Sequence, residues 1–303
     1  MTAASRSRVP SASAAAPSGS TQAAGRVPRP WAYTAFPVEV SAVARVTPNF
    51  VRITFTGETL KHFAPWGLDQ RIKLVFPHPD GSFADFGLLA DPTPHPSHWY
   101  ARWKQLPAEE RNVLRTYTPS GIRPEMREID VDMLIHDPPG PASQWAQSAE
   151  VGDRLVINGP DARNGYTGYG LHWSPREAAN LLLAGDESAF PAMANIHSSL
   201  GKDVKVEILA ESSDPLDGAL LPTSANVVVR QPNTEPGTGL EELIWEWGAR
   251  QDLATLDDDV YVWIAGESDA VARIRRYLTK ELGIAKNRIA FFGYWRAGGP
   301  LTG

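Results

Sequence analysis

Hydrophobic and polar residues alternate along the first half of the chain, from about residue 31 to residue 160. Short runs with this period of two, rich in Val, Ile, Thr and aromatic residues, are typical of β-strands. The runs are residues 37–46, 50–57, 70–77, 113–119, 128–136 and 153–160. Because turn residues separate them, we expect an antiparallel six-stranded β-barrel. The proline-rich insert at residues 89–111 is expected to be a loop or short helix that covers the barrel.

The pattern changes in the second half, where continuous apolar runs alternate with apolar residues at helical spacing. Continuous runs predict buried strands, and their alternation with helices predicts a doubly wound α/β domain with a parallel sheet. The expected strands are residues 180–185, 204–212, 226–230, 260–268 and 288–295, and the expected helices are 187–201, 238–250 and 269–283. In the last helix, Asp269 is expected to be the N-cap and Gly283 to follow the final turn.

These patterns divide the chain into a leader (1–30), a β-barrel domain (31–160), a linker (161–176) and an α/β domain (177–303). The leader is rich in Ala, Ser, Pro and Gly, so we expect it to be disordered. It lacks the apolar segment of roughly 7 to 15 residues that a secretory signal needs. The sequence also has no apolar run of about 20 residues that would span a membrane. We therefore expect a cytoplasmic protein.

Composition narrows the range of chemistry. The 303 residues include 29 Lys and Arg against 35 Asp and Glu, a formal net charge of −6, so nucleic acid is not an expected partner. The sequence contains no Cys, which excludes disulfides, thiol nucleophiles and Cys-ligated clusters. Redox chemistry would therefore need an organic cofactor or a metal without thiolate ligands. No metal site is expected, because His95 and His98 have no third ligand in view and are read as surface residues.

Two segments in the second half could bind a nucleotide. Gly185, Asp186, Glu187 and Ser188 follow one predicted parallel strand, and residues 265–268, with Gly266 and Glu267, follow another. Ligands bind at the carboxyl ends of such strands, and free amides at a helix N-terminus favour a phosphate. Neither segment has the GxGxxG pattern, so plain strand-to-helix turns are the alternative.

Two segments of the barrel could bind a cofactor. Alternation places Arg115 and Tyr117 on one face of a strand, where they suit a diphosphate and an aromatic ring, and the Thr118 hydroxyl can donate to a ring heteroatom. The alternative is an ordinary exposed strand face. A second strand is expected to end at His136, before a Gly-Pro-Ala-Ser turn (140–143) whose helix amides could bind an anion.

Taken in order, these segments resemble the siderophore-interacting proteins. That family comprises the flavin-dependent ferric-siderophore reductases of the ferredoxin-reductase-like superfamily. The resemblance is carried by RTYT (115–118), His136 with GPASQWA (140–146), LLAGDESAFPA (182–192), WIAGE (263–267) and GYWRAG (293–298). It extends from about residue 31 to residue 299, which is nearly the whole chain outside the leader.

The resemblance implies an FAD-binding barrel and an NAD(P)H-binding α/β domain. It implies that Arg115 contacts the FAD diphosphate, that Tyr117 packs on the isoalloxazine and ribityl chain, and that Thr118 hydrogen-bonds the ring edge. Backbone amides of Gly140, Ala142 and Ser143 would also contact the diphosphate. Asp186, Glu187 and Ser188 would meet FAD or the nucleotide, Gly185, Gly266 and Glu267 would border the nicotinamide, and Trp295 would cover the flavin. Ser120 stands where the family often has a basic residue, which puts one anion contact in doubt.

The activity implied is reduction of ferric siderophores, with electrons passing from NAD(P)H through FAD, so that ferrous iron is released. Hard oxygen ligands hold ferrous iron more weakly than ferric iron. A general NAD(P)H flavin reductase and a non-catalytic, flavin-loaded siderophore-binding protein are the alternatives, and FMN in place of FAD stays open. The sequence names neither the siderophore nor the oligomeric state.

An anionic ferric siderophore needs a local basic patch on this acidic protein. Arg276, Lys280 and Lys286 are the preferred candidates, with Arg273 and Arg288 beside them and Arg71 and Lys73 on a barrel strand as others. A solvated helix face is the alternative reading of the first group. The acids Glu211 and Asp214 follow the second parallel strand, which favours a free ribose hydroxyl, and hence NADH over NADPH.

Overall fold

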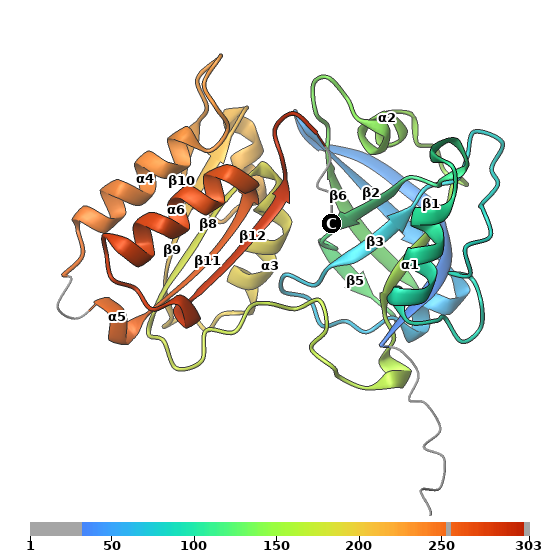
Figure 1. Ribbon diagram of the computed structural model, residues 1–303, viewed down its shortest axis with the longest axis horizontal. Helices are drawn as coiled ribbons and strands as arrows, with labels where there is room; N and C mark the ends of the chain where they lie inside the picture. The colour runs from blue at the N-terminus through green and yellow to red at the C-terminus, as the bar shows by residue number, and fades with distance from the viewer. Residues whose placement is uncertain (1–31, 253–255, 300–303) are drawn as a thin grey trace, which may run out of the picture.

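The computed structural model describes residues 32–252 and 256–299, which fold into two lobes built on separate sheets (Figure 1). The leader expected at residues 1–30 lies outside the described residues. Within the described ranges, no helix combines the length and the apolar character that crossing a membrane requires.

The first lobe is an antiparallel, curled sheet of seven strands with the order β4-β3-β7-β1-β2-β6-β5. The strands are β1 (Tyr33–Thr47), β2 (Phe50–Thr56), β3 (Ile72–Val75), β4 (Leu114–Tyr117), β5 (Gly121–Arg123), β6 (Glu128–Leu134) and β7 (Arg154–Pro160). The antiparallel fold is confirmed, but the expected count of six strands was wrong. The missed strand is β5, which has only three residues and pairs with β6 alone, too short a segment for an alternating pattern.

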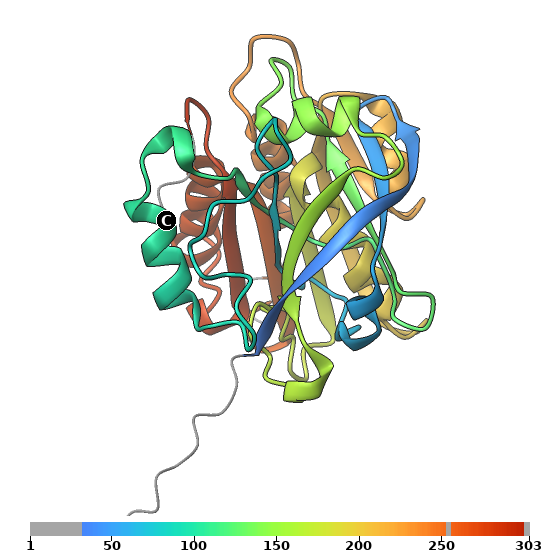
Figure 2. The same ribbon diagram turned by 90° about the vertical axis from the view of Figure 1, so that its right-hand side faces the viewer.

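The long strand β1 joins the two halves of this sheet. Its first part, from Tyr33 to Glu39, pairs with β7, and its second part, from Glu39 to Thr47, pairs with β2. Figure 2 shows β1, in blue, crossing the lobe diagonally. The concave side encloses a buried core in which Phe36, Ile53 and Leu74 have no exposed surface. The curl follows because one strand must serve two partners in sequence.

Two helices cover the first lobe. Helix α1 (Pro96–Gln105) lies in the proline-rich insert, and its Trp99 packs with Phe86 and Val75 in a second, smaller core. The side chain of His95 caps α1 by accepting a hydrogen bond from the Ser97 amide at 3.1 Å. Helix α2 (Pro141–Ser148) packs against the main core through Ala142 and Ala146.

The second lobe is a parallel sheet, as expected, and its strand order is β10-β9-β8-β11-β12. Its strands are β8 (Asn180–Asp186), β9 (Lys205–Ser212), β10 (Asn226–Val229), β11 (Val260–Glu267) and β12 (Ile289–Trp295). Helix α3 (Phe190–Ser199) packs on one face with Leu183 and Trp263. Helices α4 (Thr238–Ala249) and α6 (Ser268–Lys280) pack on the other face, and α5 (Leu256–Asp259) is a short helix before β11 (Figure 1). Apolar layers on both faces explain the continuous apolar runs of the strands.

The N-cap expected for the last helix was wrong. Glu267, not Asp269, is the N-cap of α6, because its longer side chain folds back to accept hydrogen bonds from the amides of Asp269 and Ala270, both at 2.8 Å. The end of α6 was anticipated, since Gly283 follows it with a φ of 74°.

A buried carboxylate links the two lobes. Asp217 lies in a short 3₁₀ helix (Pro215–Leu220) after β9 and is completely buried. Its Oδ1 accepts hydrogen bonds from the Thr47 hydroxyl at 2.6 Å and the Asn49 amide at 3.1 Å, and its Oδ2 accepts one from the Asn49 side chain at 2.8 Å. The turn between β1 and β2 is therefore anchored on the second lobe.

We expect Asp217→Ala to lower the free energy of unfolding by about 2–4 kcal/mol, because three donors lose their buried acceptor. Urea unfolding monitored by tryptophan fluorescence measures the change. The matched control is Asp203→Ala, at an exposed position of the same lobe, which should change stability by less than about 0.5 kcal/mol. A stability of Asp217→Ala equal to that of the control would contradict an anchoring role.

Candidate functional site

The flavin-like motif of the first lobe lies against the second lobe. The Tyr294 side chain on β12 is hydrogen-bonded to Thr118, which follows β4 and is buried. The Asn195 side chain on α3 donates hydrogen bonds to the carbonyls of Pro119 at 2.8 Å and Leu68 at 3.0 Å. The segment after β4 therefore meets β12 and α3.

Arg115 and Tyr117 project from the same face of β4, as expected. In the antiparallel register Arg115 pairs with Leu74 and Tyr117 with Ile72, and both partners belong to the main core. Tyr117 packs against that core, and burial raises the pKa of its hydroxyl. Arg115 is exposed, and its guanidinium donates a hydrogen bond to the carbonyl of Leu114 at 2.8 Å. The guanidinium is thus available to an anion beside an aromatic ring.

The turn before α2 is built by Ser143. Its hydroxyl donates to the Leu134 carbonyl at 3.1 Å and accepts from the His136 amide at 3.3 Å, which fixes the end of β6 against the helix. Gly140 is the N-cap of α2, and no side chain caps the first turn. The amides of this first turn, including those of Ala142 and Ser143, are therefore free to bind an anion.

Asp186, at the end of β8, is a buried hub that connects three strand ends. Its Oδ2 accepts hydrogen bonds from the Glu267 amide at 2.7 Å and from the Trp295 indole at 2.8 Å. Its Oδ1 accepts from the amide and hydroxyl of Ser188, at 3.0 and 2.5 Å. Burial, together with nearby Glu187, raises the pKa of this carboxyl to about 6. Asp186 therefore holds Trp295 in place. The centroid of the Trp295 ring lies 6.3 Å from the centroid of the His136 ring.

The two glycines of the strand-end motifs are required by close packing. A Cβ on Gly185 would lie 2.6 Å from the Ala189 Cβ and 2.7 Å from the Ala265 carbonyl oxygen. Gly266 has a φ of +153°, and a Cβ there would lie 2.6 Å from Asp186 Oδ2. Glu187 is buried and accepts a hydrogen bond from the Ser213 amide.

The expected siderophore contacts on and after α6 are not brought to this site. Helix α6 starts beside Glu267 and runs back along the sheet, so Lys280 lies about 18 Å from its first turn. Lys286 precedes the first residue of β12, at the same far edge, and Arg276 lies two turns along the helix. All three are exposed. In contrast, Lys73 on β3 pairs with Thr116, next to Arg115. Burial, together with the nearby charge of Arg71, lowers the pKa of Lys73.

Of the two acids expected to favour NADH, Glu211 and Asp214, Glu211 does not face a ligand. Glu211 is completely buried, and its Oε1 accepts hydrogen bonds from the Gly237 amide at 2.8 Å and from Arg230 at 3.2 Å. Its Oε2 accepts from the Leu240 amide at 3.1 Å. The preference for NADH over NADPH therefore stays a prediction, and Glu211 gives it no support.

Sequence reasoning missed a second group of residues between the lobes. Asp69 is buried and accepts hydrogen bonds from the amides of His172 and Trp173 and, at 2.9 Å, from the Trp263 indole. The His172 ring lies 4.3 Å from that of Phe292 on β12. Side chains alternate along β12, so Phe292 and Tyr294 lie on the same side of the strand. This pattern could have identified Tyr294 from the sequence as a residue of this group. Nothing in the sequence indicated Asp69.

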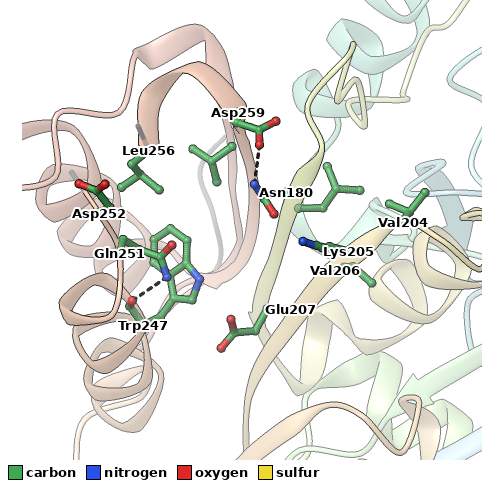
Figure 3. A pocket seen from close by; sticks show the side chains of 12 residues that line it. Asn180, Val204, Lys205, Val206, Glu207, Trp247, Gln251, Asp252, Leu256 and Asp259 are labelled. Carbon is green, nitrogen blue, oxygen red and sulfur yellow. Dashed lines mark hydrogen bonds between the residues drawn. The ribbon is translucent and has the colours of Figure 1, made fainter. Parts of the chain in front are cut away.

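A cavity of the described chain lies elsewhere. It measures about 630 Å³ at the edge where β8 and β9 begin, and Asn180, Lys205, Glu207 and Trp247 are among its lining residues (Figure 3). It is therefore not part of the site at the strand ends. Within residues 32–252 and 256–299, no group of three or more His, Cys, Asp or Glu could hold a metal ion.

Sequence comparison divides the chain as the two lobes do. Residues 39–164 match the profile of the siderophore-interacting FAD-binding domain, and residues 178–298 match that of the siderophore-interacting protein. The NADPH-dependent ferric-chelate reductase of Escherichia coli is 30% identical over 270 residues, covering 85% of this chain and 91% of that protein. The ferric vibriobactin reductase ViuB of Vibrio cholerae is 28% identical over 261 residues, covering 84% of this chain and 86% of that protein.

Some relatives are much longer than this chain. The mycobactin import ATP-binding/permease protein IrtA of Mycolicibacterium smegmatis is 29% identical over 219 residues, which are 70% of this chain but only 23% of that protein. Among solved structures, a siderophore utilization protein from T. fusca is 28% identical, with a TM-score of 0.67 over 89% of this chain and 95% of that one. The ferredoxin reductase of carbazole 1,9a-dioxygenase, 17% identical with a TM-score of 0.57 over 86% of this chain and 69% of that one, shares the fold.

Proposed function

Because the chain belongs to the siderophore-interacting protein family, we propose that it is a flavin-dependent oxidoreductase that reduces ferric siderophores and releases ferrous iron. Electrons would come from NAD(P)H through FAD. The observation that carries the proposal is the meeting of two lobes at one place. The β4 segment with Arg115 and Tyr117 lies against β12, whose last residue Trp295 is held by Asp186.

The residues present fit FAD. Arg115 and the uncapped first turn of α2 offer positive charge and free amides, which suit a diphosphate. Tyr117 offers a partly buried aromatic face for the flavin ring. When bound, FAD accepts a hydride and returns electrons singly, which a ferric acceptor requires.

The residues of the chain itself would bind the cofactor and orient the ferric complex toward it. With no Cys in the sequence, no thiol or cluster relay carries electrons through the protein, so the ferric complex must approach the flavin edge directly. Trp295 and Tyr294, both fixed by hydrogen bonds, would limit one side of that approach. We propose Arg71 and Lys73, which lie just before and on β3, the strand paired with β4, as contacts of an anionic siderophore in preference to Lys280, Lys286 and Arg276. We also propose a cytoplasmic location, where reduced nicotinamide nucleotides are supplied.

Anaerobic mixing of the FAD-loaded protein with NADPH, the ferric complex of 2,3-dihydroxybenzoate and ferrozine tests the proposal. We expect bleaching of the flavin followed by the ferrous-ferrozine colour. Bleaching without the ferrous product would instead indicate a general flavin reductase. No bleaching with NADPH or NADH would indicate a flavin-loaded binding protein. A protein that cannot be loaded with FAD would overturn the proposed function and both alternatives.

A further inference from the structure

Every principal helix that starts at the carboxyl edge of the parallel sheet begins next to a carboxylate of the protein itself. These are α3 after β8, α4 after β10 and α6 after β11. In parallel α/β folds this edge receives a dinucleotide, and the amides of a first helical turn hold its diphosphate. Whether those amides are free therefore decides how a nucleotide can bind here.

The first turn of α6 is closed by Glu267. Its Oε2 accepts hydrogen bonds from the amides of Asp269 and Ala270, both at 2.8 Å, and its Oε1 accepts one from the Ala297 amide at 3.2 Å. The side chain is buried, with 4% of its residue surface exposed. A phosphate could reach these amides only by displacing a buried carboxylate.

The first turn of α4 is closed in the same way by Glu211. This carboxylate accepts hydrogen bonds from the amides of Gly237 and Leu240, at 2.8 and 3.1 Å, and it has no exposed surface. Arg230 lies within salt-bridge distance of two of these carboxylates, 3.2 Å from Glu211 and 3.7 Å from Glu187. Its guanidinium is therefore already shared between two carboxylates.

Before α3 the space for a phosphate is filled as well, because Asp186 is the N-cap of the 3₁₀ turn Glu187–Ala189 that leads into this helix. Asp186 accepts hydrogen bonds from the amides of Ser188 and Glu267, at 3.0 and 2.7 Å. Gly266 lacks a side chain, as glycines that admit a diphosphate do, yet its open side is covered by Asp186 Oδ2, 2.6 Å from the position of a Cβ. The carboxylate occupies the place where a phosphate oxygen would approach.

Charge acts in the same direction as these contacts. Asp186, Glu187, Glu211 and Glu267 are all buried, and with Arg230 they give this edge a formal charge of −3 when ionised. A dinucleotide diphosphate adds two negative charges. Inside a protein such like-charge repulsion is screened much less than at an exposed surface.

We infer that Glu267, with Asp186 and Glu211, excludes the nucleotide diphosphate from these helix N-termini, so that the protein selects hydride donors by their dihydronicotinamide ring. This inference rests on the proposed function, because it concerns the donor of the same site. It predicts a substrate class wider than NADH and NADPH, which includes donors that carry no adenylate and no diphosphate.

The first test needs no variant. Reduction of the FAD-loaded protein is compared for NADPH, reduced nicotinamide mononucleotide and the uncharged 1-benzyl-1,4-dihydronicotinamide. We expect kcat/KM for the mononucleotide to lie within about tenfold of that for NADPH. The reason is that no helix amide holds the adenylate half of the dinucleotide, which the mononucleotide lacks. A loss above about a hundredfold would overturn the inference, because it would show that the diphosphate and adenylate are held tightly.

The second test measures binding directly. We expect Glu267→Gln to bind ADP-ribose about three- to tenfold more tightly than the natural chain by calorimetry, because one buried negative charge is removed while one amide-accepting oxygen remains. Glu281→Gln, at the far end of α6 and exposed, is the matched control and should leave the affinity unchanged. Equal or weaker ADP-ribose binding by a Glu267→Gln protein that unfolds within about 2 °C of the natural chain would overturn the inference.

These results are separable from a failure of the proposed function. Photoreduced FAD-loaded protein, prepared without any nucleotide, is mixed with the ferric 2,3-dihydroxybenzoate complex. Ferrous release in that experiment establishes the reductase whatever the nucleotide results are. Its absence would reject the reductase while leaving the ADP-ribose comparison intact.

Discussion

Arg115→Ala is expected to weaken FAD binding by about 10- to 150-fold. Hydrogen bonds to charged groups contribute about 1.5–3 kcal/mol, and Arg115 is the exposed guanidinium of the β4 motif. Because the exposed guanidinium donates its hydrogen bond to the carbonyl of the adjacent residue, Leu114, its removal should leave the fold intact. Flavin content after purification and FAD titration of the apoprotein, followed by fluorescence, measure the effect.

Two further variants separate charge from geometry. Arg115→Lys keeps the charge but not the planar fork, so its affinity should fall between those of the natural chain and Arg115→Ala. Arg45→Ala, at an exposed position of β1, is the matched control and should retain normal flavin content. Unchanged FAD affinity in Arg115→Ala would mean that the diphosphate does not lie beside β4.

Asp186→Ala is expected to lower the free energy of unfolding by about 3–5 kcal/mol, the range for breaking a buried charged network. Removal of the carboxylate leaves the Glu267 amide, the Trp295 indole and both Ser188 donors without their acceptor. We also expect Trp295 to lose its fixed position, so flavin fluorescence in the loaded protein should change. Chemical unfolding and flavin fluorescence together measure the two effects.

The pH dependence of Asp186→Asn tests the same network. In the folded protein the Asp186 carboxyl has a pKa of about 6, above its ordinary value of 3.8, because it is buried. The folded state therefore binds the proton more tightly, and this stabilisation is present below about pH 4 and lost as pH rises through 6. The stability of the natural chain relative to Asp186→Asn should fall across this interval, by at most about 3 kcal/mol.

Urea unfolding of both proteins between pH 4 and pH 8 measures this difference. Asp203→Asn, at an exposed aspartate, is the control and should show no such trend. A difference that stays level, or that grows with rising pH, would contradict the burial of an ionisable Asp186.

Much of the fold could be predicted from the spacing of apolar residues, because buried positions recur at regular intervals along strands and helices. The five parallel strands were placed correctly, since strands covered on both faces must be apolar throughout. Strand β5 was missed because three residues cannot display an alternation. The position of Lys280 could have been deduced: a helix that follows a parallel strand runs back, so its last residue lies at the opposite edge.

The site was predictable in position but not in orientation. Residues 185–188 and 266–267 do meet at one edge of the sheet. Their carboxylates turn inward, however, and that depends on amides supplied by other segments, such as Gly237 and Leu240 for Glu211. No local pattern reports which distant donor an acid will find. The linkage of Asp217 to Thr47 and Asn49 was invisible for the same reason.

The most direct measurement is the stoichiometry of iron reduction by the flavin. FAD-loaded protein is photoreduced without oxygen and titrated with the ferric 2,3-dihydroxybenzoate complex in the presence of ferrozine. If the flavin converts an electron pair into single electrons for iron, two ferrous chelates should form for each flavin reoxidised. Flavin that stays reduced, or that is reoxidised without ferrous product, would contradict the assignment as a ferric-siderophore reductase.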